Sequence, residues 1–94
     1  MTYVVYLLVT KTKYKWISYV GYTNNIKNRL LAHNNSKGAK FTRGRKWEII
    51  YQKRYKNKST AMKEEYKLKK DKKKRNILKS NYIKKNENIN FTAL

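Results

Sequence analysis

The apolar run at residues 2–9, TYVVYLLV, constrains the fold more than any other part of this chain. It is rich in β-branched and aromatic residues, which favour strands. With about seven apolar residues in succession it is too short to cross a bilayer, and it lacks the basic leader and cleavage site of a secretory signal. The run therefore predicts a strand buried inside a small domain.

Two further segments carry strand patterns. Residues 16–22, WISYVGY, follow a short polar link and predict the second strand of an antiparallel hairpin. In residues 47–54, WEIIYQKR, large apolar side chains alternate at Trp47, Ile49 and Tyr51. This alternation predicts a third strand with one buried face.

A helical pattern follows the predicted hairpin. A helix of about ten residues is expected after Asn24 or Asn25 as N-cap, and it should end near Asn35. The next segment, 36–46, contains two glycines and five basic residues. This composition is typical of an exposed basic loop.

The second half of the chain predicts further helices. Ser59 is a candidate N-cap for a longer helix over residues 60–75, with acids early and bases late, which suits the helix dipole. Residues 76–85 predict a short final helix, and the asparagine-rich tail 86–94 is expected to be frayed. The order of elements predicts one α+β domain over residues 1–85, a three-stranded antiparallel sheet flanked by helices.

The chain carries 25 lysines and arginines against five acids among its 94 residues, a net charge of +20. Asp71 lies inside the basic run 69–75 and is expected to pair with its neighbours. The charge favours a polyanion, above all nucleic acid, because counterion release strengthens such binding. An anionic membrane surface is the rival partner, but no segment has the apolar face of an interfacial helix. An AT-rich coding genome would also raise the lysine count.

Cysteine is absent from the chain. Neither a disulfide framework nor a thiolate zinc site can therefore stabilise the small core, and nothing argues for an oxidising compartment. We expect an intracellular protein, in the bacterial cytoplasm or in a host cell if the source is viral.

Glu65 stands out among the five acids, which are Glu48, Glu64, Glu65, Asp71 and Glu87. At about 100° per residue along a helix, Glu65 lies on the same side as Ala61 and Leu68 and should point toward the core. By the same angle, Glu64 should face solvent. A carboxylate on the core side suits a metal ion, although a structural ion pair with Lys69 would explain it equally well.

Arg29 and His33 are four residues apart on the first predicted helix. They flank the apolar face of Ile26 and Leu30, so both are expected to border the sheet. The pair suits a phosphate, because arginine can grip two oxygens at once and histidine can take up a proton near neutral pH. The alternative for His33 is a purely structural hydrogen bond.

Four tyrosines lie on the predicted hairpin, which could bring two of them onto one face: Tyr3, Tyr6, Tyr19 and Tyr22. Core packing accounts for most tyrosines in such positions. A phenol beside a bound phosphate and a cation could instead have its pKa of about 10 lowered enough to act as a base toward water.

Ordered motifs along the chain resemble the GIY-YIG nuclease family: VVYLL, then YVGYTNN, RLLAHN, GAKFTRGRKWEIIY and STAMKEEYKLKK. The resemblance covers nearly the whole chain and rests on the series of motifs. It is closest to small single-domain bacterial members and to the nuclease module of the eukaryotic structure-specific endonuclease subunit. That eukaryotic relative carries a cysteine-rich zinc module, which a chain without cysteine lacks.

The resemblance implies a role for each matching residue. Tyr6 closes the first signature, in which Val4 stands where the family usually has glycine, and Tyr19, Val20 and Gly21 form the second. Gly21 would let the backbone approach the substrate or the next helix closely. The implied catalytic residues are Tyr6 or Tyr19 as general base, Arg29 to stabilise the phosphate, His33 to accept or relay the tyrosine proton, and Glu65 to hold the metal.

Further residues are expected to contact nucleic acid: Gly21, Lys37, Lys40, Arg43, Arg45, Lys69, Lys70 and Asn76. The basic side chains would meet backbone phosphates, which carry no sequence information. Asn76 is matched to a family asparagine that steadies the substrate or a tyrosine, and Asn81 competes for that role.

The resemblance implies hydrolysis of DNA phosphodiesters by a tyrosine-assisted water with one Mg²⁺ or Mn²⁺ ion. We expect a structure-selective enzyme that acts on flaps, nicks or branched DNA. A non-catalytic basic nucleic-acid-binding protein of the same fold is the alternative, and an RNA endonuclease would share the chemistry. Residue types leave open the oligomeric state and the pathway, whether repair, recombination, mobile-element spread or viral replication.

Overall fold

A three-stranded antiparallel sheet with helices on both faces forms the fold, seen in a computed structural model that describes residues 2–92, with side chains through residue 85. The strands lie in the order β2-β1-β3, and they are β1 (Tyr3–Lys11), β2 (Trp16–Thr23) and β3 (Glu48–Tyr55). The helices are α1 (Ile26–Asn34), α2 (Lys58–Lys70) and α3 (Lys72–Thr92), with a short 3₁₀ helix η1 (Lys40–Thr42). The predicted α+β class is confirmed.

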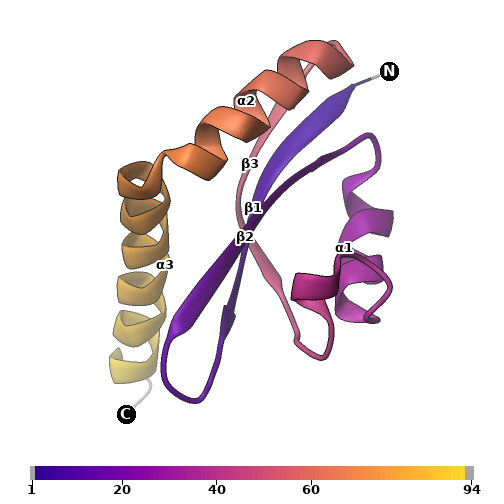
Figure 1. Cartoon of the computed structure of the whole chain (residues 1–94). Helices are drawn as coiled ribbons and strands as arrows, with labels where there is room; N and C mark the ends of the chain where they lie inside the picture. The colour runs from indigo at the N-terminus through magenta and orange to yellow at the C-terminus, as the bar shows by residue number, and fades with distance from the viewer. Residues whose placement is uncertain (1, 93–94) are drawn as a thin grey trace.

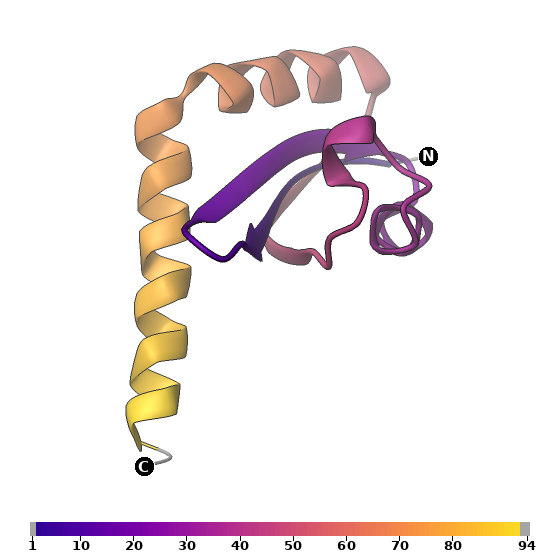
Figure 2. The same ribbon diagram turned by 60° about the horizontal axis from the view of Figure 1, so that its bottom comes forward.

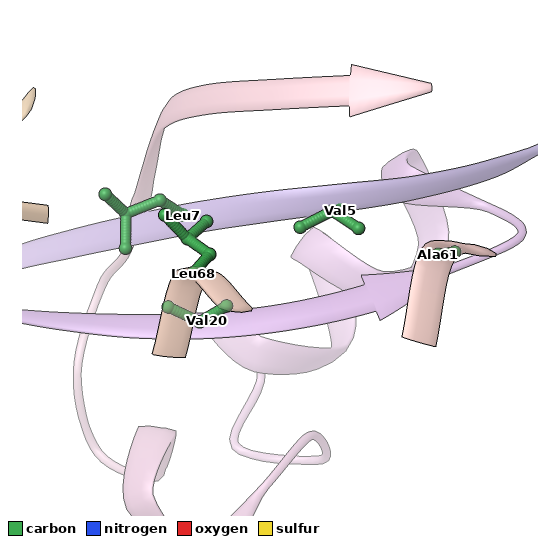
Figure 3. Close-up of a cluster of buried hydrophobic side chains, with 5 residues drawn as sticks. All are labelled: Val5, Leu7, Val20, Ala61 and Leu68. Atoms are coloured by element: carbon green, nitrogen blue, oxygen red, sulfur yellow. The ribbon is translucent and has the colours of Figure 1, made fainter. Parts of the chain in front are cut away.

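β1 is the central strand, and helices cover it from both sides. α1 and η1 lie on one face of the sheet and α2 on the other (Figures 1 and 2). On the α2 face the buried side chains are Val5, Leu7, Val20, Ala61 and Leu68 (Figure 3). On the α1 face they are Tyr6, Leu8 and Trp47. A strand covered on both faces must be apolar at successive positions, which explains the unbroken run at residues 2–9.

A β-bulge in β3 overturns one expectation about that strand. Leu7 of β1 pairs with Tyr51, whereas Leu8 pairs with Ile49, so Ile50 is the extra residue. Ile49 consequently packs on the α1 face and Tyr51 on the α2 face. The prediction that Trp47, Ile49 and Tyr51 share one buried face is wrong, because the extra residue shifts the alternation by one position.

Asparagines begin the first two α-helices. The Asn25 side chain accepts the backbone N–H of Asn28 at 3.1 Å, which confirms one of the two expected caps of α1. In α2 the cap is Asn57, whose side chain accepts the N–H of Thr60 at 2.9 Å. The prediction of Ser59 as the cap is wrong, because Asn57 is extended and already meets the first free N–H groups.

Asp71 separates α2 from α3, and the two helices meet at a sharp corner (Figure 2). Its carboxylate accepts the N–H of Lys74 at 3.0 Å and its carbonyl accepts the N–H of Arg75 at 3.1 Å. Asp71 is thus a helix cap as well as a neighbour of lysines, and the single helix expected over residues 60–75 is two helices.

α3 replaces the short final helix expected over residues 76–85 and is anchored to the hairpin. The ring of Tyr82 meets Trp16 edge-on at 5.8 Å between centroids. The backbone stays helical to Thr92, through most of the segment 86–94 for which a frayed tail was expected; residues 93–94 lie outside the described residues. Nothing after Gly44 in the sequence is a glycine or proline, the residues that break helices most strongly.

Within residues 2–92, no helix combines the length and the apolar character needed to cross a bilayer.

Candidate active site

Tyr6 reaches the edge of the sheet because its partner on β2 is a glycine. Tyr6 pairs with Gly21 in the β1–β2 register. A Cβ atom on Gly21 would overlap the Tyr6 hydroxyl and lie 2.6 Å from Cζ, so the end of the phenol fills the space of a missing side chain. Gly21 therefore makes room for the Tyr6 ring, and it also lines the pocket to which a close approach of the substrate was expected.

A chain of hydrogen bonds runs inward from the Tyr6 hydroxyl. The phenol oxygen lies 2.9 Å from Nε2 of His33, and Nδ1 of His33 lies 2.9 Å from Oγ1 of Thr42. The Thr42 hydroxyl donates to the carbonyl of Ala39 at 2.9 Å, so it accepts from Nδ1–H. In a neutral imidazole Nε2 is then the unprotonated nitrogen, and it accepts a hydrogen bond from the Tyr6 hydroxyl.

His33 is deeply enclosed, with 1% of its surface exposed. A Cβ atom on Gly38 would overlap its ring, with only 2.9 Å to Cε1, so Gly38 makes room for the imidazole as Gly21 does for the phenol. Burial and the positive charge of Arg29 lower the pKa of His33 below its ordinary value. A neutral imidazole with a free Nε2 lone pair is ready to accept a proton.

Burial raises the pKa of Tyr6, and the nearby Arg29 guanidinium opposes that rise. The neighbouring Tyr19 and Glu65 add a smaller upward effect. Tyr6 therefore keeps its proton at neutral pH, and it can act as a base toward water only if that proton moves to His33 in the same step.

Arg29 and Glu65 join Tyr6 in one pocket of about 120 Å³ at the β2 edge. Arg29 comes from α1 on one face of the sheet, and Glu65 from α2 on the other. The full lining is Tyr6, Tyr19, Val20, Gly21, Tyr22, Arg29, Glu65 and Lys69. The structure thus brings together most of the catalytic residues implied by the motifs.

Arg29 has an unused hydrogen-bond donor. Its Nε is buried and has no partner among the described residues. An unpaired buried N–H costs free energy, so an acceptor that reached this group would stabilise the site. A guanidinium with a free donor suits a phosphate oxygen.

Glu65 faces the pocket, and its side chain is 14% exposed. Lys69 Nζ lies 3.1 Å from Glu65 Oε1. This is the i,i+4 ion pair that the sequence analysis gave as the alternative to metal binding. Glu64 is 35% exposed and pairs with Lys67, so the expected contrast between the two neighbouring acids is present.

The residues fit one divalent cation. In the part of the chain that the structure describes, no three His, Cys, Asp or Glu side chains cluster as a metal cage. Mg²⁺ often binds through one or two carboxylates and completes its shell with water and substrate phosphate oxygens. The single carboxylate of Glu65 in this pocket could supply such a ligand, and the described residues that line the pocket include no second carboxylate.

Tyr19 packs its ring between His33 and an aromatic cluster. Its centroid lies 5.2 Å from His33, 6.1 Å from Phe41 and 6.4 Å from Trp47. Register places Tyr6 and Tyr19 on the α1 face, whereas Tyr3 and Tyr22 pack on the α2 face. The hairpin therefore brings two tyrosines onto one face, as expected.

The other residues expected to contact nucleic acid are dispersed. Exposed basic side chains between α1 and β3 belong to Lys37, Lys40, Arg43 and Arg45. Lys70 lies over the ring of Tyr66, at 4.7 Å from its centroid. Asn76 and Asn81 both line a groove on α3 that shares no residue with the pocket, so neither reaches it.

The sequence reading missed Thr42 and Gly38. Thr42 sets the His33 tautomer and receives no signal from helix or strand periodicity, because it lies in η1 between the regular elements. The first glycine of the segment 36–46, Gly38, was available as a signal, yet what it makes room for depends on a contact across the fold.

Comparison with known proteins identifies the family. The GIY-YIG catalytic domain model matches residues 2–87. A UPF0213 protein of Staphylococcus haemolyticus is 40% identical over 65 residues, covering 68% of this chain and 78% of the relative. Because the family model spans nearly the whole sequence, the chain belongs to the GIY-YIG family of nuclease catalytic domains.

Other relatives match a shorter segment. A UPF0213 protein of Oceanobacillus iheyensis is 56% identical over 52 residues, which is 54% of this chain and 60% of that protein. The chain thus spans less than two thirds of that relative's length. The solution NMR structure of the UPF0213 protein BH0048 from Bacillus halodurans is 33% identical, covers 85% of this chain and 84% of the other, and has a TM-score of 0.47.

The lowered pKa of His33 predicts a titration that can be measured directly, because this is the chain's single histidine. Its NMR resonances should titrate below the ordinary value of about 6.5, and its ¹⁵N shifts should report the Nδ1–H tautomer. The free energy of unfolding should fall as the pH drops below that value, because the unfolded chain takes up the proton first.

His33→Gln is the control for this titration and should flatten the pH dependence of unfolding. A wild-type imidazole that titrates at or above the ordinary value, or that carries its proton on Nε2, would contradict the assigned hydrogen-bond chain.

Proposed function

We propose that this chain is a metal-dependent DNA endonuclease in which Tyr6 activates water and His33 receives the phenolic proton. The observation that carries the proposal is the hydrogen-bonded chain Tyr6–His33–Thr42, which begins in the pocket that Arg29 and Glu65 also line. Membership of the GIY-YIG family supports the nuclease chemistry.

The proton path gives Tyr6 its role. As water attacks phosphorus, the bond from phosphorus to the leaving sugar oxygen breaks. One proton of the water passes to the Tyr6 oxygen while the phenolic proton moves along the hydrogen bond to Nε2 of His33, which lies 2.9 Å from the phenol oxygen. Thr42 holds Nδ1–H, so Nε2 is the nitrogen that accepts. Tyr6 is preferred over Tyr19 as the base because its hydroxyl has this acceptor, whereas Tyr19 meets His33 through its ring.

Arg29 and Glu65 complete the site. Arg29 would bind the phosphate through its guanidinium, which borders the pocket, and stabilise the charge that builds on the phosphate during attack. Glu65 would hold Mg²⁺ or Mn²⁺, and the ion, when bound, would offset negative charge on the phosphate and leaving oxygen. Lys69, now paired with Glu65, keeps the carboxylate in the pocket.

Binding of DNA without catalysis is the alternative function. The ion pair between Glu65 and Lys69 at 3.1 Å supports it, because this pair explains a partly buried carboxylate without any metal. The hydrogen-bonded phenol, histidine and threonine favour catalysis, because the chain begins in the pocket and leads to a nitrogen that can take up a proton.

Glu65→Gln tests the hydrolytic function, with Glu64→Gln as matched control. Glu65→Gln should abolish cleavage of labelled DNA in Mn²⁺ or Mg²⁺ while binding, measured in chelator, is retained. Glu64→Gln should cleave as wild type, because Glu64 lies outside the pocket and pairs with Lys67. Cleavage that survives Glu65→Gln, or that needs no metal, would contradict the metal-binding role of Glu65, and absence of cleavage by the wild type would leave only a binding protein.

Arg29→Ala tests stabilisation of the phosphate. Loss of a transition-state donor of this kind raises the barrier by about 3 kcal/mol, roughly a hundredfold in the cleavage rate. Lys40→Ala removes a charge from the exposed basic segment and should cost much less. Comparable losses in the two variants, measured under single-turnover conditions, would count against the role of Arg29.

The charge distribution argues against selectivity for sequence, and we propose selectivity for DNA shape. The exposed lysines and arginines would contact backbone phosphates, and such contacts position DNA without reading its sequence. On this proposal, flapped, nicked and four-way DNA should be cut faster than linear duplex of the same sequence. Equal rates on matched linear and branched substrates would refute this selectivity.

A further inference from the structure

A second groove adjoins the catalytic pocket and plays no part in the proton path. It measures about 240 Å³ and shares Tyr19, Val20 and Lys69 with that pocket. Its complete lining is Ser18, Tyr19, Val20, Phe41, Lys69 and Arg75. A group bound here would lie next to a phosphate held by Arg29.

Phe41 forms an exposed aromatic wall of this groove. It lies in η1 and is 51% exposed, although its ring is fixed by neighbours. The ring stacks on Tyr19 at 6.1 Å with an interplanar angle of 21°, and it lies 6.1 Å from Trp47. The Arg45 guanidinium lies 5.5 Å from the ring centroid. A held but exposed phenyl ring beside cations is the kind of surface on which nucleic-acid bases stack.

Two cations line the groove with Phe41. Lys69 pairs with Glu65, and 54% of its side chain is exposed. Arg75 lies at the corner between α2 and α3, where its Nε donates to the carbonyl of Leu68 at 3.1 Å. That bond fixes the guanidinium through one nitrogen and leaves the others to a ligand such as a phosphate. Aromatic wall and cations together match a nucleotide, which has a flat base and an anion.

We propose that this groove binds the unpaired nucleotide next to the scissile phosphate, with its base on Phe41 and its phosphate on Arg75. The inference rests on the proposed nuclease function and names its substrate class: DNA with an unpaired nucleotide beside the cut. Inside an intact duplex both faces of a base are covered by neighbouring bases, so stacking on Phe41 requires an unpaired base. The groove thereby explains how a surface that contacts only phosphates can select DNA by shape.

A structural role for Phe41 is the competing explanation. If Phe41 only covered Tyr19 and Trp47 from solvent, its position would require an apolar side chain of similar volume but not an aromatic ring. Phe41→Leu keeps apolar volume and removes stacking, whereas Phe41→Tyr keeps both. The two variants therefore distinguish a role in packing from a role in base stacking.

The test uses the full chain in chelator, so that binding is read without cleavage. The DNA is a duplex with a single-stranded flap that carries the fluorescent base 2-aminopurine at successive positions from the junction. Wild type and Phe41→Tyr should quench the probe at one position near the junction, and Phe41→Leu should not. Stacking of one base is worth about 1–3 kcal/mol, so Phe41→Leu should bind the flap roughly 5- to 150-fold more weakly.

The matched controls are a fully paired duplex and a distant aromatic residue. Phe41→Leu should bind the paired duplex within about twofold of wild type, since a paired base makes no stacking contact with residue 41 that the substitution could remove. Tyr14→Leu replaces a tyrosine that is 87% exposed in the hairpin turn and should leave quenching and affinity unchanged. Thermal melting checks that each variant is folded. The position-specific quenching expected of the wild type tests the groove even if a variant fails to fold.

The outcomes separate this inference from the nuclease proposal. Quenching that persists in Phe41→Leu, or equal weakening on flap and paired duplex, overturns the groove even if Glu65-dependent cleavage is observed. Position-specific quenching that depends on an aromatic ring at residue 41, in a protein that cuts no DNA under any metal, supports the groove and sinks the nuclease proposal.

Discussion

The hydrogen bond from the Tyr6 hydroxyl to Nε2 of His33 is the contact on which the rest of the site depends. It joins the central strand β1 to α1, and the further bond to Thr42 brings in η1. Gly21 and Gly38 leave the space that the phenol and the imidazole occupy. A buried polar pair is stable only when every group is satisfied, so the position of each neighbour is constrained by this chain of bonds.

The edge of the sheet explains how residues from opposite faces meet. β2 is an edge strand, and at Gly21 it carries no side chain to separate the two faces. Arg29 can therefore approach from the α1 face and Glu65 from the α2 face while both line the pocket around Tyr6. The candidate active site arises from this arrangement of the two helices around the sheet edge, whereas a net charge of +20 favours polyanions in general and specifies no site.

Much of the site could be read from local pattern. Helix angle alone set Glu65 apart from Glu64, and the structure gives their side chains 14% and 35% exposure. The expected hairpin brings Tyr6 and Tyr19 onto one face. Two predictions of secondary structure were wrong because one residue interrupts a regular pattern. The extra residue Ile50 shifts the alternation in β3, and Asp71 ends one helix while capping the next.

The amino-acid pattern was enough to predict the order of the elements, the apolar central strand and the series of family motifs, because periodicity and capping act between residues a few positions apart. Which tyrosine has a proton acceptor, and which nitrogen of His33 accepts, became visible in the folded chain. Tyr6 and His33 are 27 positions apart in the chain, and Thr42 follows nine positions later. Their contacts exist only once the sheet and helices have packed, since no local pattern fixes the direction of a hydrogen bond between distant side chains.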